Sequence, residues 1–150
     1  MTATPSTLQT CFACHNQYKK FRDMNIISIM IGGSIGALLR YFISSGVYGV
    51  ISHDFPWGTL VVNLIGSFLI GLFWQLFDTY PISPQMRAML FTGGLGAFTT
   101  FSTYSLETVI LLQDGQFKLG LMNTAFSAAL GVVAIILGMV TVRYLIPVQR

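Results

Sequence analysis

Charged residues are scarce in this chain. Of 150 residues, 8 are Lys or Arg and 5 are Asp or Glu, so that 9% are charged. Soluble domains average about 25%. Hydrophobic residues make up 53% of the chain, and its mean hydropathy is +0.69. So few charges would leave most of the apolar surface uncovered in water, which excludes an ordinary soluble protein. The composition predicts an integral membrane protein with no soluble domain.

Residues 1–23 contain no central apolar run of the kind that a signal peptide needs. They hold the only two cysteines of the chain, and Cys11, Cys14 and His15 match the CxxCH pattern of covalent haem attachment. A haem needs a packed pocket, and this polar segment has no apolar core to provide one. A structural zinc site would need a fourth ligand. We therefore expect no haem, and either a disordered N-terminal tail over residues 1–23 or an upstream mis-start before Met24.

Four long runs with little charge follow the polar segment. A helix needs about 20 apolar residues to cross a membrane, and the predicted spans are residues 26–51, 58–77, 85–112 and 117–146. The third span contains many Gly and Thr residues, which both have low helix propensity. This helix is therefore predicted to break near its middle, over residues 93–99. The expected fold is all-α, with one four-helix transmembrane domain over residues 24–150.

Lys and Arg residues near the ends of the spans indicate the orientation in the membrane. One side has Lys19, Lys20, Arg22, Arg87, Arg143 and Arg150, and the other has Arg40 and Lys118. Six against two predicts that both termini are cytoplasmic. If translation starts at Met24, the count falls to three against two. Such an even count permits insertion in both orientations and hence an antiparallel, dual-topology homodimer. The sequence does not decide between a start at Met1 and a start at Met24.

Two polar side chains interrupt the first two spans. Arg40 either extends to the membrane surface or stands at a pore mouth, where it attracts anions. Asn63 lies in the middle of its span, where its amide must be satisfied by a neighbouring helix or by a permeating species. Glycines on one face of the first span, such as Gly32, Gly33 and Gly36, favour close helix packing over a ligand site.

The third span combines aromatic rings with hydroxyl groups. Phe98, Phe101 and Tyr104 recur every three residues among five Ser and Thr residues. Ring edges are electropositive and hydroxyls donate hydrogen bonds, so both suit an anion; core packing, with hydroxyls bonded to helix carbonyls, is the alternative. If the helix unwinds over 93–99, its freed carbonyls need donors or a cation. Glu107 is expected to pair with a cation such as Arg or to relay protons.

Three segments together resemble the signatures of the CrcB/Fluc fluoride channel family. They are GGSIGALLRY over residues 32–41, WGTLVVNLIG over residues 57–66 and GGLGAFTTFSTYS over residues 93–105. The resemblance extends from residue 24 to about residue 144, and three such motifs in order are specific. It implies a four-helix subunit, paired antiparallel with a second copy, that encloses two fluoride pores and one central structural sodium ion.

The resemblance also implies roles for single residues. Asn63 matches the pore asparagine of the second helix. Phe101 and Tyr104 match the two pore-lining aromatics, although the family usually has Phe at the second. Gly96 and Thr99 match positions whose backbone carbonyls bind the sodium ion. Polar positions of the pore or its vestibule are matched by Arg40, Thr103, Glu107 and Ser127.

The expected function is passive, fluoride-selective export from the cytoplasm through the cell (inner or plasma) membrane, with no enzyme activity and no catalytic residue. The expected partners are a second copy of the chain, fluoride and membrane lipid. No nucleic acid is expected, since the basic residues form no patch. A small proton-coupled multidrug exporter is the alternative, but it needs a carboxylate deep in its first helix, and residues 26–51 contain none. A non-transporting assembly subunit would leave Asn63 and the hydroxyl–aromatic segment unexplained.

Overall fold

The computed structural model describes residues 5–51 and 54–146, with side chains from residue 22 onward. In the described residues every regular element is a helix, which confirms the predicted all-α class. The elements are α1 (Pro5–Tyr48), α2 (Trp57–Thr79), α3 (Pro84–Arg87), the π-helix η1 (Ala88–Leu95), α4 (Gly96–Phe98), α5 (Phe101–Gln113) and α6 (Phe117–Leu145).

Four stretches are long and apolar enough to cross a membrane. They are Arg22–Tyr48, Trp57–Thr79, Pro84–Gln113 and Phe117–Leu145, and they agree with the predicted spans to within a few residues at each end. Most of their large apolar side chains are exposed, and only a few, such as Leu60, Val62 and Val142, are buried. This pattern fits helices that lipid, rather than water, surrounds.

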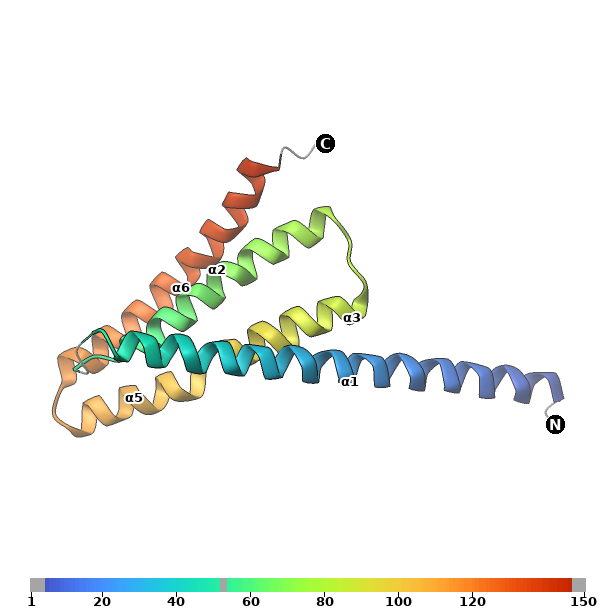
Figure 1. Cartoon of the computed structure of the whole chain (residues 1–150), viewed down its shortest axis with the longest axis horizontal. Helices are drawn as coiled ribbons and strands as arrows, with labels where there is room; N and C mark the ends of the chain where they lie inside the picture. Colours follow the sequence, from blue (N-terminus) through green and yellow to red (C-terminus); the bar gives the residue numbers. More distant parts are fainter. Residues whose placement is uncertain (1–4, 52–53, 147–150) are drawn as a thin grey trace.

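The helices pack in two groups. Figure 1 shows α2 (green) beside α6 (orange to red), and α1 (blue to cyan) beside the yellow segment that contains η1. Both contacts are close. A Cβ atom at Gly36 would collide with the carbonyl oxygen of Gly94, and one at Gly138 would collide with that of Phe68. Gly36 and Gly138 therefore serve helix packing, as the sequence predicts, whereas a Cβ atom at Gly33 would meet nothing within 4 Å.

α1 begins at Pro5, inside the segment predicted to be a disordered tail, and its backbone is helical from there. Its amino-terminal part extends past the other helices (Figure 1). The stretch that is apolar enough to span a membrane starts at Arg22, close to the predicted boundary. Cys11, Cys14 and His15 are not among the residues whose side chains the structure describes. The absence of haem and the division of the chain at residue 23 therefore stay predictions.

The third span is broken, as predicted, at the carboxyl-terminal end of the predicted range. Residues 88–95 form the π-helix and Gly96–Phe98 are α-helical, whereas Thr99 (φ −77°, ψ 156°) and Thr100 (φ −146°, ψ 116°) are extended. Of the range 93–99 predicted to unwind, only Thr99 is extended, and Thr100 follows just beyond it. Gly93 and Gly94 remain helical because α1 packs against them. The two threonines are β-branched, which favours extended backbone.

Candidate functional site

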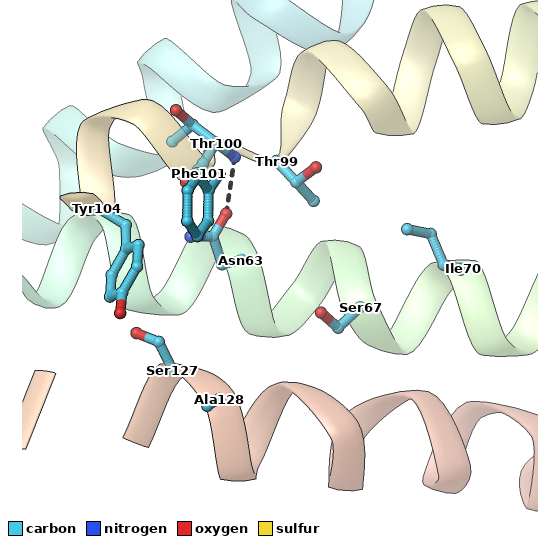
Figure 2. A pocket seen from close by; sticks show the side chains of 9 residues that line it. All are labelled: Asn63, Ser67, Ile70, Thr99, Thr100, Phe101, Tyr104, Ser127 and Ala128. Atoms are coloured by element: carbon cyan, nitrogen blue, oxygen red, sulfur yellow. Dashed lines mark hydrogen bonds between the residues drawn. The ribbon is translucent and has the colours of Figure 1, made fainter. Parts of the chain in front are cut away.

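Asn63 on α2 bridges the break in the third span. Its Nδ2 donates to the carbonyl oxygen of Thr100 over 3.0 Å, and the backbone N–H of Thr100 donates to its Oδ1 over 2.8 Å. The side-chain amide thus pairs with the extended backbone much as a neighbouring strand would. Figure 2 shows this contact in the middle of the site. A neighbouring segment therefore satisfies the amide, which is one of the two possibilities predicted.

Thr100 organises the start of α5. Its Oγ1 accepts a hydrogen bond from the backbone N–H of Thr103 over 3.2 Å and donates to the Oγ1 of Thr103 over 3.0 Å. A threonine is a favoured residue at this capping position. The break, the cap and the Asn63 bridge therefore all depend on one residue, which is 7% exposed.

A cavity of about 310 Å³ lies on one side of Asn63, and we call it the Asn63 cavity. It is lined by Asn63, Ser67, Ile70, Thr99, Thr100, Phe101, Tyr104, Ser127 and Ala128 (Figure 2). The Oγ of Ser127 is buried and has no hydrogen-bond partner in the described part of the chain. In Figure 2 the hydroxyls of Tyr104 and Ser127 point toward one another. Because an amide nitrogen carries two hydrogens, Asn63 also keeps one N–H beyond the bond to Thr100.

A second cavity of about 260 Å³ contains Arg40, and we call it the Arg40 cavity. It is lined by Ala37, Arg40, Tyr41, Ser44, Ser45, Thr59, Val62, Thr100 and Thr103. Among the side chains described, Arg40 forms no ion pair. Arg40 therefore borders a small space in which most of the lining residues carry a hydroxyl group. Thr100 lines both cavities, so the Asn63–Thr100 bridge lies where the two approach each other.

Glu107 lies one helical turn beyond Thr103 on α5. Its Oε1 accepts hydrogen bonds from the hydroxyl of Tyr48 over 3.0 Å and from that of Thr59 over 2.7 Å. The sequence predicts a cation such as Arg, or a proton-relay role. In the described side chains Glu107 has no ion pair, and two hydroxyls take the place expected for the cation.

The three aromatic rings that recur along the third span do not all line one site. The Phe101 and Tyr104 rings lie 5.5 Å apart between centroids and line the Asn63 cavity. Phe98 is 5% exposed and packs in a separate apolar pocket with residues of α1 and α2. Spacing along one helix predicts a common face, and the break at Thr99 and Thr100 removes that continuity.

Gly96 and Thr99, whose backbone carbonyls are predicted to bind a sodium ion, lie at or beside the break. Within residues 54–146, no backbone N–H outside the helices donates to the carbonyl of Gly96 or Thr99. The described residues contain no cluster of His, Cys, Asp and Glu that would hold a metal ion instead. A hard cation is bound by oxygen ligands, so the donor type fits sodium.

Three residues of this region were not singled out by sequence reasoning. Tyr48 and Thr59 hold Glu107, and they come from segments that only the folded structure brings together. Asn123 on α6 is 2% exposed and donates from Nδ2 to the Oγ1 of Thr108 over 2.9 Å. Asn63 was identified from the sequence because its amide lies within an otherwise apolar span. The same pattern could have identified Asn123.

The sequence model of one protein family, described as CrcB-like protein, Camphor Resistance (CrcB), matches residues 27–139. The chain belongs to the CrcB family. The match begins a few residues after Met24 and contains all four membrane-spanning stretches in whole or in large part. It also contains every residue of the two cavities.

Curated relatives of this CrcB family member carry a common name. A protein of Magnetococcus marinus named Fluoride-specific ion channel FluC is 48% identical over 121 residues, which are 80% of this chain and 98% of that protein. A protein of Parabacteroides distasonis with the same name is 42% identical over 117 residues, or 78% of this chain and 91% of that protein. One of Salinibacter ruber, also so named, is 45% identical over 115 residues, or 77% and 86%. Together with its four spans, this places the chain among multi-pass membrane proteins.

Proposed function

We propose that this CrcB family member is a fluoride-selective ion channel that passively exports fluoride from the cytoplasm. The observation that carries the proposal is a pair of small cavities that share Thr100, each with hydroxyl or amide donors in its lining. The relatives named fluoride-specific ion channels support the same conclusion. A channel for one ion needs no catalytic residue, and the protein is not an enzyme.

The two cavities suit a small, strongly hydrated anion. Arg40 supplies a positive charge at one of them, which raises the local anion concentration. Beyond Thr100, the spare N–H of Asn63 and the hydroxyls of Tyr104 and Ser127 are donors that replace part of the hydration shell. The edges of the Phe101 and Tyr104 rings add electropositive surface without a fixed charge that would hold the ion too tightly.

Export follows from the chemistry of fluoride and from the membrane potential. Hydrogen fluoride crosses a membrane as a neutral acid and ionises inside the cell. A potential that is negative inside then drives the anion out with about 2.3 kcal/mol per 100 mV. No coupling to a second ion is needed, and the site of action is the cell (inner or plasma) membrane.

We further propose that the channel is an antiparallel homodimer with a structural sodium ion. The free carbonyls of Gly96 and Thr99 would hold the ion, which neutralises the exposed backbone dipoles at the break. One subunit offers two such carbonyls, so a two-fold axis through the site would double the number. The exposed Phe101 ring, at 80%, is consistent with a surface that a second copy covers.

A small proton-coupled multidrug exporter fits the site less well. Such a transporter needs a carboxylate in its binding site to take up cations and protons. The two cavities are lined by no carboxylate, and their single charged residue is Arg40.

Efflux from vesicles tests the proposed function. Purified protein is reconstituted into vesicles loaded with potassium fluoride, and external fluoride is followed with an electrode after a potassium ionophore is added. Rapid fluoride release that requires the ionophore, with no release of chloride from matched vesicles, is the expected result. Release without the ionophore, or equal release of chloride, would contradict a fluoride-selective channel.

A further inference from the structure

The Glu107 carboxylate is held by residues from two other helices. Tyr48 is the last residue of α1, and Thr59 lies in the first turn of α2. Both hydroxyls donate to the same oxygen, Oε1, while Oε2 is buried and has no partner in the described residues. This carboxylate lies in a membrane-spanning stretch, where an ionisable group is expensive to keep.

The local packing fixes the Tyr48 ring in this position. Gly58 on α2 lies directly beneath the ring, because a Cβ atom there would come within 2.5 Å of Tyr48 Cε2 and 2.9 Å of Ser44 Oγ. The missing side chain thus gives the ring room to lie against the start of α2 and to direct its hydroxyl toward α5.

The carboxylate is next to the Arg40 cavity but outside it. Thr59 and Thr103 line that cavity, and Glu107 follows Thr103 by one helical turn. Glu107 is not among the lining residues. If its carboxylate turned toward the cavity, it would bring a negative charge close to the path of an anion and closer to Arg40, which is unpaired among the described side chains.

We propose that Tyr48 is a positioning residue that, together with Thr59, keeps the Glu107 carboxylate out of the Arg40 cavity and so keeps Arg40 available to fluoride. The two hydroxyls occupy Oε1 with charge-assisted hydrogen bonds, which are stronger than neutral ones. Loss of one of them frees the carboxylate to turn. This inference rests on the proposed fluoride channel, because it assigns Tyr48 an effect on anion flux.

A double-mutant cycle on fluoride efflux tests the proposal. Tyr48→Phe removes the hydroxyl and keeps the ring, and it should lower efflux about fivefold, within the range of coupling between residues in contact. In the Glu107→Gln background the same substitution should change efflux little, since no negative charge remains to be restrained. Tyr80→Phe, at an exposed tyrosine, is the matched control and should leave efflux unchanged. An equal fall in both backgrounds would show that Tyr48 acts through packing and would overturn the proposal.

A second measurement reads the hydrogen bond without any transport. Glu107 is the only glutamate in the chain, so protein made by cell-free synthesis with carboxyl-¹³C glutamate gives one labelled side-chain carboxyl signal. Tyr48→Phe should move this signal, and Tyr80→Phe should not. If Glu107→Gln abolishes flux, the double-mutant cycle cannot measure the effect of Tyr48→Phe. A carboxyl signal that stays in place in Tyr48→Phe would then still overturn the proposal. If the unaltered protein releases no fluoride, the proposed function fails, while the carbon signal still reports on the Tyr48 contact.

Discussion

Replacing Asn63 with Asp changes one atom of the bridge and adds one charge. The carboxylate can still accept from the backbone N–H of Thr100, but an oxygen now faces the Thr100 carbonyl oxygen where Nδ2 donates over 3.0 Å. The lost hydrogen bond costs about 1–2 kcal/mol of stability. The new charge also borders the Asn63 cavity.

The effect of this charge on flux can be worked out from the geometry. A fluoride ion about 4 Å from the carboxylate, at an effective dielectric constant of about 20, is repelled by about 4 kcal/mol. That barrier corresponds to a roughly thousandfold loss of flux. Asn63→Ala removes the bridge without adding charge, so we expect it to lose much less flux than Asn63→Asp.

Fluoride efflux per folded protein is the assay, with size-exclusion chromatography in detergent to confirm that each variant keeps its assembly. Asn123→Asp is the matched control, because Asn123 is a buried amide that lines neither cavity. It should cost stability but leave efflux of the folded protein nearly unchanged. Normal efflux by Asn63→Asp, or equal losses in the Asp and Ala variants, would refute the placement of Asn63 on the anion path.

Three further predictions concern the tail, the break and the helix packing. Deleting residues 1–23 should leave fluoride efflux intact, and the full-length protein should show no haem absorbance. A covalent haem in the full chain, or loss of flux on deletion, would contradict this. Prolonged dialysis into sodium-free buffer should weaken the dimer, measured as subunit exchange, and abolish flux through both pores together, measured as fluoride efflux. Unchanged efflux from demonstrably sodium-free protein would rule out a structural ion. Gly36→Ala should lower the free energy of unfolding by about 1–3 kcal/mol, because a Cβ atom there meets the Gly94 carbonyl. Gly46→Ala, where a Cβ atom would meet nothing within 4 Å, should change the free energy of unfolding little. Equal unfolding curves for the two variants would show that the contact between Gly36 and Gly94 is not tight.

The four spans could be predicted from the sequence because they depend on local composition. A run of about 20 apolar residues determines a membrane helix without reference to the rest of the chain. The position of the break in the third span could be predicted only approximately, since it depends on the packing of a neighbouring helix. Gly93 and Gly94 have low helix propensity, yet they stay helical against α1, and the extended residues are instead Thr99 and Thr100.

The candidate site was predictable where a polar side chain within a span must be satisfied and has few possible partners. Asn63 had to find a partner, and the structure gives it the backbone of Thr100. The partners of Glu107 were not predictable, because a carboxylate can be satisfied by a cation or by hydroxyls. Only the folded chain brings Tyr48 and Thr59 to it. Phe98 was misplaced because its spacing was read along a continuous helix.

The reversal potential of the current across a planar bilayer tests the central claim most directly. The protein is inserted with a tenfold fluoride gradient and equal chloride on both sides, without a proton gradient. A fluoride-selective channel should carry a current that reverses at about 59 mV in magnitude, with the sign set by the fluoride gradient. Reversal near zero, or a current that appears only when a proton gradient is imposed, would contradict passive and selective fluoride permeation.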